Sequence, residues 1–332
     1  FLRRLVSCTI TPLVKWAYNE PDCYEGVLKQ VWMWKNHRKI RHILDKTEYG
    51  TVIISAPSFV LFRFARIIKK RNASVSIVFD YRDPWHLWNR RKNFAYFSEK
   101  RCLKYADAIV GFTDNFTEDM KKTFHLPAPK CHTVYNGYSK TDWIFSETDY
   151  SPPFIRIPGR LYLIFTGNLT FWDSEQNFRN PFPLMEAVSA FSEVELYFIG
   201  VRGQLPDINY RNIHFIRNVS QKESFHFMKA ADVLISIHDA ADSSGNYLIS
   251  GKFYDYIRSG RVIWHIGRQE DLMSEWIRQY HLGVFCTNHA SRLKEMLQFL
   301  LQKQKRNSLD TLRKSKEAFV QQFSRETQNS HY

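Results

Sequence analysis

Long hydrophobic runs are missing from this chain of 332 residues, and its five cysteines form no close group. No stretch of about 18 uncharged apolar residues occurs, which argues against a transmembrane helix. The cysteines include no CxxC pair and no cysteine–histidine cluster at zinc spacing, so we predict no metal site. An odd number of scattered cysteines favours free thiols in a reducing compartment, and hence a cytoplasmic protein.

Positive charge is abundant and unevenly spread. The formal net charge is +14: residues 1–150 hold 25 lysines and arginines against 15 acidic residues, and the other 182 residues hold 22 against 18. A basic first half indicates either an anionic partner, nucleic acid or an anionic membrane surface, or simply a well-solvated surface. Around residues 29–43, Trp32 and Trp34 stand among basic residues, as in an amphipathic helix that lies on a bilayer or covers a sheet.

Short apolar segments alternate with helical patterns in two series. This alternation predicts βαβ units and two parallel sheets. A turn-rich stretch, Tyr-Ser-Pro-Pro followed by Ile-Pro-Gly within 149–159, separates the series. The predicted strands are 51–56, 75–80, 108–113 and 133–135, then 161–166, 195–199, 213–216, 233–237, 262–266 and 284–286.

We therefore predict an α/β protein of two Rossmann-like domains that face a cleft. The first domain spans 1–150 and the second spans 151–307. A charged helix over 308–323 begins a C-terminal segment, 308–332, that is expected to cross back to the first domain. Ligands of such sheets bind at the carboxyl ends of the strands, so the loops there should carry the chemistry.

A short helix after the strand at 233–237 is the best candidate for binding an anion. Ser250 is a plausible N-cap, and Gly260 a plausible residue just beyond the helix end. Lys252, Asp255 and Tyr256 stand at i, i+3 and i+4, on one face near the helix start. Free N–H groups, the helix dipole and a lysine suit a diphosphate, and an aspartate suits ribose hydroxyls. The alternative is an ordinary capped helix with a Lys252–Asp255 ion pair.

In the first half, the strand at 75–80 runs into Tyr81-Arg82-Asp83-Pro84-Trp85. Asp83 or Asp80 is a candidate to orient an acceptor hydroxyl or to act as a base. The alternative is a structural ion pair between Arg82 and Asp83. Two further candidates follow the first predicted strand of the second domain, at 161–166. Gly167, before Asn168, lets the backbone approach a ligand, and Arg179 offers a bidentate donor to phosphate.

At these positions the chain resembles the family-4 glycosyltransferases of the GT-B superfamily, above all those acting on bacterial surface polysaccharides. The most specific matching segment is Gly-Lys-Phe-Tyr-Asp-Tyr-Ile-Arg-Ser-Gly-Arg-Val-Ile at 251–263, which is similar to the family's Lys-x-x-Glu-Tyr-x-x-x-Gly-x-Pro segment. The other matching segments are 77–85, 104–113, 134–138, 165–169 and 231–236.

This resemblance implies retaining sugar transfer from a nucleotide-sugar to a glycan or lipid-linked acceptor in polysaccharide biosynthesis, without metal or cofactor. The second domain would bind the donor, the first would receive the acceptor, and the protein would sit at the cytoplasmic face of the membrane, without nucleic acid. The implied catalytic residues are Asp83, Arg82 and Asp80. The implied donor-binding residues are Gly167, Asn168, Arg179, Ser250, Gly251, Lys252, Asp255 and Tyr256.

Three departures from the family pattern stand out. No carboxylate occupies the place of the family's first glutamate, eight positions before Asp255, where Tyr247 stands. Asp255 itself is one methylene shorter than the glutamate that it replaces. Nothing before Thr51 resembles the opening strand and Gly-rich loop, so we expect an N-terminal domain that lacks its first βα unit.

Three other functions compete with the transferase. An NAD-dependent oxidoreductase is disfavoured because no GxGxxG follows a predicted strand. A nucleotide-sugar epimerase shares the fold and stays an alternative. A non-catalytic basic protein that binds anionic lipid or nucleic acid is the third; clusters such as 69–71 and 90–92 supply charge but no sequence readout.

Overall fold

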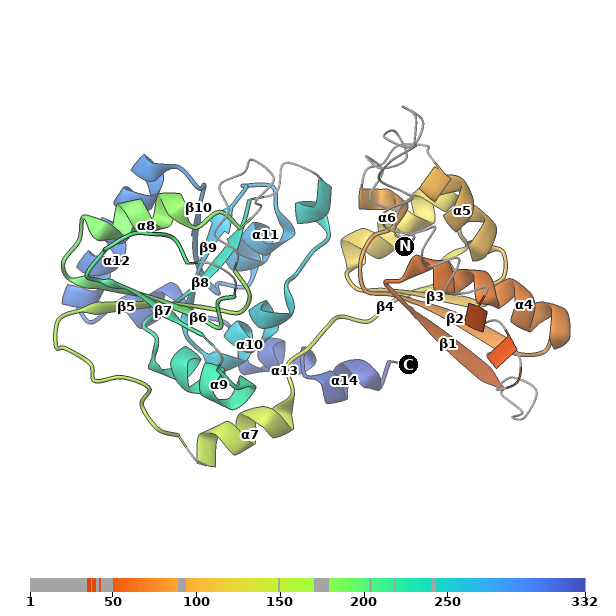
Figure 1. The fold of residues 1–332 in the computed structure, drawn as a ribbon, viewed down its shortest axis with the longest axis horizontal. Coiled ribbons are helices and arrows are strands. Elements are labelled where there is room, and N and C mark those ends of the chain that lie inside the picture. Colours follow the sequence, from red (N-terminus) through yellow and green to blue (C-terminus); the bar gives the residue numbers. More distant parts are fainter. Residues whose placement is uncertain are drawn as a thin grey trace. The chain divides into compact units, whose positions relative to one another are not determined.

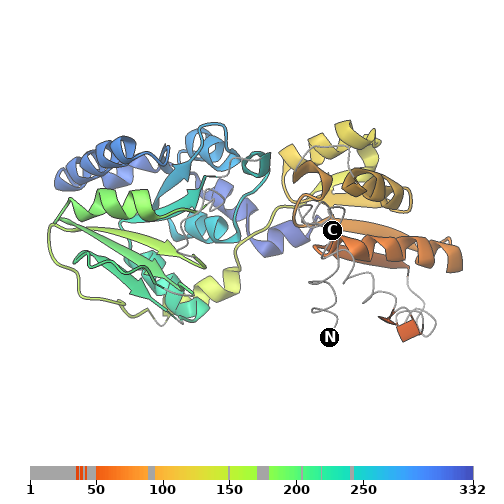
Figure 2. The same cartoon turned by 45° about the horizontal axis from the view of Figure 1, so that its top comes forward.

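The fold is that of a computed structural model. It describes residues 35, 36, 38, 39, 42, 50–88, 94–148, 150–169, 179–202, 205–217, 219–239 and 243–331. The chain divides into two compact units, 1–133 and 134–332. Each unit holds one parallel β-sheet (Figures 1 and 2).

The sheet of the first unit has four parallel strands in the order β1-β2-β3-β4. The strand order advances in one direction, so right-handed crossovers place the connecting helices on one face. Phe62 fills the space between helix and sheet on this face, stacked on Phe79 with ring centres 4.1 Å apart. The strands are β1 (Thr51–Ala56), β2 (Ser76–Tyr81), β3 (Ala108–Gly111) and β4 (Cys131–Thr133), and the helices are α4 (Phe64–Arg71), α5 (Phe94–Leu103) and α6 (Asp114–Phe124), with 3-10 turns at Phe59–Arg63, His86–Trp88 and Ala128–Lys130.

The sheet of the second unit has six parallel strands in the order β10-β9-β8-β5-β6-β7. Numbered by their order in the chain, the strands from β7 to β10 read 3-2-1-4-5-6, the order of a dinucleotide-binding Rossmann sheet. The strands are β5 (Leu161–Thr166), β6 (Val194–Ile199), β7 (Ile213–Ile216), β8 (Val233–His238), β9 (Val262–Gly267) and β10 (Gly283–Cys286).

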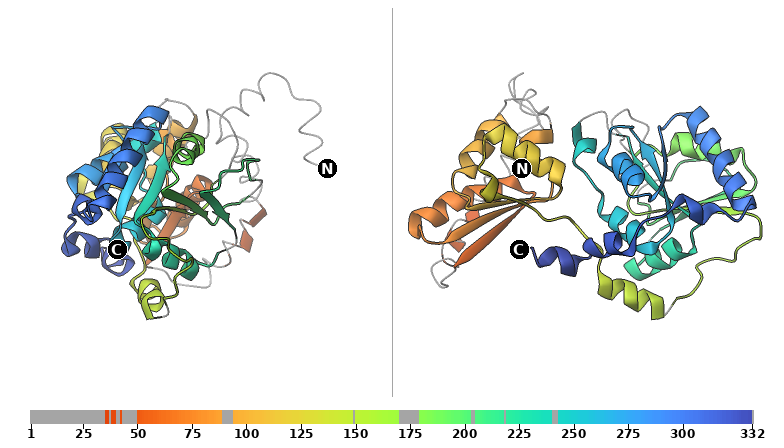
Figure 3. Two further views of the ribbon diagram at one scale, coloured as in Figure 1. Left: turned by 90° about the vertical axis from the view of Figure 1, so that its left-hand side faces the viewer. Right: turned by 180° about the vertical axis from the view of Figure 1, so that it is seen from behind.

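Helices cover both faces of this sheet (Figure 3). All six residues of β5, β8 and β9 are buried, as expected for central parallel strands. Leu163 and Phe165 pack toward α8 and α12, whereas Ile164 packs toward α9, α10 and α11. The helices are α7 (Lys140–Thr148), α8 (Phe182–Ser189), α9 (Gln221–Ala230), α10 (Gly251–Ser259), α11 (Leu272–Gln279), α12 (Ala290–Lys305), α13 (Glu317–Gln322) and α14 (Arg325–Asn329), with 3-10 turns at Ser243–Asn246 and Leu309–Leu312.

The prediction of two Rossmann-like parallel-sheet domains is confirmed. The turn-rich stretch before β5 belongs to the second unit and packs against its sheet. Phe154 stacks on Tyr162 and Tyr197, and Arg156 donates to both carboxylate oxygens of Asp232. The compact units divide between Thr133 and Val134, so the expected boundary at residue 150 falls inside the second unit.

The single helix predicted over 308–323 is wrong. A 3-10 turn at Leu309–Leu312 ends at an extended Arg313, and α13 starts only at Glu317. The reason is tertiary: the Arg313 side chain is bonded to α10, which holds the chain extended there. This whole segment belongs to the second compact unit.

Two predicted basic features fall largely outside the described residues. In the expected amphipathic helix, positions 35, 36, 38, 39 and 42 are helical, and Trp32 and Trp34 are not described. The cluster at 90–92 is not described either. Within the described ranges, no helix combines the length and apolar character needed to cross a bilayer.

Gly283 provides a test of the second sheet. It begins β10, and a Cβ at this position would lie 2.0 Å from the backbone oxygen of Ile263 in β9. Backbone cannot yield without parting the two strands, so Gly283→Ala should lower the free energy of unfolding by about 2–4 kcal/mol, measured by denaturant titration. Gly251→Ala is the matched control, since nothing lies within 4 Å of its Cβ. Equal losses in the two variants would contradict the steric explanation.

Candidate functional site

The strand order of the second unit marks a position for a ligand. β5 has β6 on one side and β8 on the other, so the order of strands reverses between β5 and β8. Crevices form at the carboxyl ends of strands at such a switch point. Gly167 follows the end of β5, and α10 is the first α-helix after the end of β8. The predicted donor-binding residues of both segments therefore belong to one edge of one sheet.

Helix α10 begins without a side-chain cap. Ser250 occupies the N-cap position, as predicted, but its hydroxyl makes no cap bond and has no partner among the described residues. Gly251, the first helical residue, is exposed and open. Gly260 ends the helix with a left-handed φ of 76°, also as predicted. An uncapped helix start leaves N–H donors and the positive end of the helix dipole for an anion.

Lys252 carries the most unusual charge of the site. Its Nζ is inaccessible to solvent, lies 3.2 Å from the centre of the Phe165 ring, and has no hydrogen-bond partner among the described residues. Burial lowers the pKa of Lys252 well below its usual value, and the nearby charge of Arg179 lowers this pKa further. The alternative Lys252–Asp255 ion pair is not formed. A buried ammonium without a counter-charge favours an anionic ligand.

Gly167 and Arg179 lie beside this lysine. A Cβ on Gly167 would stand 3.7 Å from Cδ of Lys252, and its φ of 104° suits only glycine. Gly200, after β6, adds a second left-handed glycine against the Gly167 backbone. Arg179 Nη1 donates to the Asn168 carbonyl at 3.5 Å, and burial lowers the pKa of this arginine. Lys252 and Arg179 therefore both lie close to backbone at Gly167, where no side chain would obstruct a ligand.

Tyr256 and Asp255 have different partners. The Tyr256 hydroxyl accepts from the Thr166 N–H at 2.9 Å and from the Thr166 hydroxyl at 3.2 Å, which fastens α10 to the end of β5. Asp255 Oδ1 instead accepts from Trp143 Nε1 on α7 at 3.2 Å. Burial raises the pKa of Asp255 to about 6. Lys252 Nζ thus lies near the rings of Phe165 and Tyr256, while Asp255 is bonded toward α7. A ribose contact of Asp255 stays a prediction.

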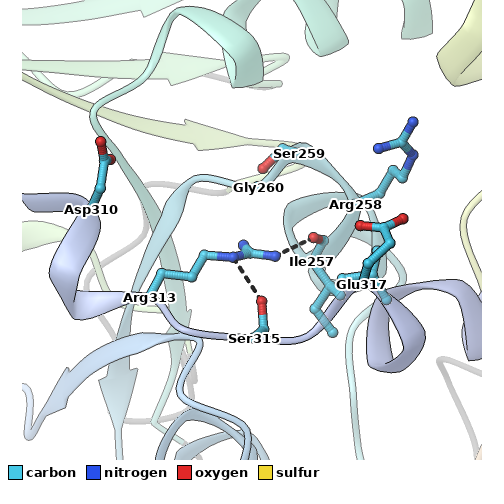
Figure 4. Close-up of a pocket in the computed structure, with 9 residues that line it drawn as sticks. Ile257, Arg258, Ser259, Gly260, Asp310, Arg313, Ser315 and Glu317 are labelled. Atoms are coloured by element: carbon cyan, nitrogen blue, oxygen red, sulfur yellow. Dashed lines mark hydrogen bonds between the residues drawn. The ribbon is translucent and has the colours of Figure 1, made fainter.

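The far end of α10 is held by Arg313, a residue that sequence reasoning missed. Its guanidinium donates to the carbonyls of Tyr256, Ile257 and Arg261. Figure 4 shows the bond to Ile257 and the bond from Nε to Ser315 Oγ. A cation at a helix C-terminus satisfies the last carbonyls and complements the helix dipole. Burial lowers the pKa of Arg313 to about 10, so it stays charged at neutral pH. Arg313 therefore positions the helix whose first turn carries Lys252.

His265 of β9 was also missed, because it sits within an apolar strand pattern. It is fully buried, and Nδ1 lies 3.3 Å from Ser236 Oγ. Burial lowers the pKa of His265 to about 3, with smaller contributions from His238 and Lys252. This imidazole therefore stays neutral and adds no charge beside the lysine.

The acidic loop of the first unit forms a separate group at the end of β2. Asp80 is buried and accepts from Ser55 Oγ at 2.7 Å and from Arg82 Nε at 2.9 Å. The alternative ion pair between Arg82 and Asp83 is thus not formed, because Arg82 pairs with Asp80. Asp83 bonds to no residue that the structure describes, and burial raises its pKa. Buried Glu99 accepts from the His86 N–H at 2.9 Å and so fixes the end of this loop.

The buried ammonium predicts a stability cost that can be measured. Lys252→Met should raise the free energy of unfolding at neutral pH by about 1–3 kcal/mol, because it removes an uncompensated charge. Between the lowered pKa of folded Lys252 and the usual value of 10.5, the unfolded state binds more protons than the folded state. The stability of the wild type therefore rises with pH in that window, and the stability advantage of the Met variant shrinks. Denaturant titrations across this pH range measure both effects. Lys294→Met, on an exposed lysine, should change stability by less than about 0.5 kcal/mol. A Lys252→Met protein less stable than wild type at neutral pH would contradict this.

No protein-family profile matches the sequence, and no curated protein is similar to it in sequence. Solved structures are similar in fold. HepE from Anabaena in complex with UDP has a TM-score of 0.58 at 11% identity, over 84% of this chain and 76% of that one. A glycosyltransferase from Rickettsia africae has a TM-score of 0.61 at 12% identity, over 90% and 78%. A protein provisionally named UDP-N-acetylglucosamine 2-epimerase from Listeria monocytogenes has a TM-score of 0.53 at 13% identity, over 86% and 74%. The likeness shows the fold, two Rossmann-like domains of the GT-B type.

Proposed function

We propose that this chain is a glycosyltransferase that moves a sugar from a nucleotide-sugar donor to a glycan or lipid-linked acceptor. The observation that carries the proposal is the ammonium of Lys252, which is buried, has no partner among the described residues and lies beside Gly167 and Arg179 at the switch point. A nucleoside diphosphate supplies the charge that this site lacks. The solved UDP complex of a protein with the same fold supports the same ligand class.

The site would act by stabilising the leaving group. As the bond from the sugar C1 to the diphosphate oxygen breaks, its electron pair and negative charge go to the phosphate. Lys252, Arg179 and the N–H groups at the start of α10 are fixed cations and dipoles for this charge. Two left-handed glycines, Gly167 and Gly200, leave room for phosphate oxygens against the backbone. Resident metal is not needed, since the protein's own cations neutralise the diphosphate.

Asp83 is the proposed acceptor-side residue. Of the two aspartates, Asp80 is committed to Ser55 and Arg82, whereas Asp83 is bonded to no described residue. A carboxylate with a raised pKa is a better proton acceptor than an ordinary one. The Asp83 carboxylate would take the proton from the hydroxyl of the acceptor as the hydroxyl oxygen bonds to C1 of the sugar. We propose that the anomeric configuration is retained.

The biological setting extends the same proposal. By this proposal the chain serves polysaccharide biosynthesis with a membrane-associated acceptor at the cytoplasmic face, and its basic first half suits an anionic membrane surface. Residues 29–41 and 90–92, the basic segments that we propose for that contact, lie mostly outside the described residues. Nucleic acid is not an expected partner.

An epimerase acting on a nucleotide-sugar is the second candidate, favoured by the fold likeness to the Listeria protein. The diphosphate site would serve either reaction. Incubation with the nucleotide-sugar alone separates them, because an epimerase converts it without an acceptor.

A nucleotide panel tests the donor site. UDP, GDP, dTDP, ADP and their sugars are compared by thermal shift. One base should stabilise the protein by about 2.7 kcal/mol at a hundredfold excess over its Kd, a rise of about 5–10 °C in Tm. Lys252→Glu should abolish this shift, because it places a carboxylate at the diphosphate, and Lys294→Glu on an exposed lysine should keep it. The donor site is refuted by a shift that survives Lys252→Glu, or by no shift with any nucleotide.

Asp83→Asn tests the acceptor side. We expect the transfer rate to fall by about 10²–10⁴-fold while the nucleotide thermal shift stays unchanged. In the wild type the rate should rise with pH through the raised pKa of Asp83, since the base acts deprotonated. Asp207→Asn, on an exposed aspartate, is the control for loss of one charge. An Asp83→Asn enzyme with wild-type turnover would remove this residue from the mechanism.

A further inference from the structure

A second pocket lies between α4 and α5 of the first unit. Its volume is about 450 Å³, and it shares no residue with the donor site or with the Asp83 loop. The floor is apolar: Phe62 is fully buried and Cys102 nearly so. The lining residues are Phe62, Arg63, Arg66, Ile67, Ser98, Arg101, Cys102 and Tyr105.

The charges that line this pocket are all of one sign. Arg63, Arg66 and Arg101 stand around it, and no aspartate or glutamate lines it. None of these three arginines forms an ion pair or side-chain hydrogen bond with the described residues. By contrast, Lys69 of α4 does form an ion pair, with Asp107 at 2.7 Å. Three uncompensated guanidinium groups around one hollow produce a local positive potential.

The helix spacing makes the arrangement regular. Arg66 and Ile67 follow Arg63 at i+3 and i+4, so all three share one face of α4 and the turn before it. On α5 and just beyond it, Arg101 and Tyr105 follow at i+3 and i+7 from Ser98. Each helix therefore brings basic and apolar side chains to the same hollow.

The buried thiol of Cys102 is affected by charges from both sides of the pocket. Burial raises the pKa of Cys102 to about 11; the charges of Arg63 and Arg101 act against this rise, and the charge of Glu99 adds to it. Arg63, from the 3-10 turn before α4, and Arg101, from α5, thus both act on one buried thiol at the pocket floor. Arginine forks suit a phosphate group bidentately, and the apolar floor suits a hydrocarbon portion.

We propose that this pocket binds a phosphate monoester attached to an apolar group. The phosphate lies among Arg63, Arg66 and Arg101, and the apolar group lies on Phe62, Ile67 and Tyr105. A free amphiphile and a lipid headgroup share this chemistry. The site is independent of the proposed sugar transfer, because it uses none of the same residues.

The probe is short-chain dihexanoyl phosphatidic acid below its critical micelle concentration, titrated by calorimetry. We expect one site per chain, with affinity that falls as salt is added. Arg63→Ala/Arg101→Ala should weaken binding by at least about tenfold, because charge-assisted hydrogen bonds to phosphate are lost. Lys70→Ala/Lys104→Ala is the matched control: it removes two charges from α4 and the end of α5, outside the pocket, and should leave affinity within about twofold. Arg66→Ala changes one exposed side chain and should weaken binding severalfold even if the double variant fails to fold.

Three results would overturn the proposal. If both double variants bound the lipid equally weakly, the attraction would be a general effect of charge. If inorganic phosphate bound as tightly as the lipid, the apolar residues would contribute nothing to affinity. Absence of binding to the wild type would end it outright. Phosphatidylcholine vesicles with and without phosphatidic acid separate the two sources. Arginine-dependent binding to both monomer and vesicle supports a headgroup, and binding to the monomer alone supports a free amphiphile.

Discussion

A lysine ammonium enclosed without a counter-charge is the constraint around which the second unit is organised. Such a group is costly, and a flexible helix would let Lys252 swing out to water. The C-terminal half of α10 is accordingly fixed: the Tyr256 hydroxyl bonds to the end of β5, and Arg313 binds the carbonyls of Tyr256 and Ile257. The free energy stored in desolvating the cation is released when an anion arrives, so ligand affinity is prepared by the folding of the unit.

The parallel sheet determines where this arrangement can exist. The Rossmann strand order opens a crevice only where β5 and β8 diverge at their carboxyl ends. Burial on both faces of β5, β8 and β9 keeps that edge rigid. Left-handed glycines at 167 and 200 then leave backbone without side chains at the ends of β5 and β6. The rigid sheet edge and the accessible glycine backbone both follow from the fold, whereas the positive charge at this edge comes from a few side chains.

Periodicity sufficed for the sheets and for the local features of α10, but not for long-range partners. Ser250, Gly260 and the strand at 161–166 follow from local rules of capping and burial, and the structure has them there. Sequence spacing could not reveal that Asp80 rather than Asp83 takes Arg82, since both lie within reach along the chain. Arg313 was hidden for the same reason: its partners are more than fifty residues away, and their carbonyls carry no sequence signal.

The bonds between Arg313 and α10 have a consequence for synthesis. The six strands can pair once β10 has emerged, because every strand partner lies at or before Cys286. Helix α10, however, lacks its C-terminal support until residue 313 has left the ribosome, and the short parallel bridge between Tyr138 and Ser324 closes later still. Nascent chains halted before that point would carry a complete six-stranded sheet, with α10 bonded to β5 through Tyr256 but without the support of Arg313 at its last turn.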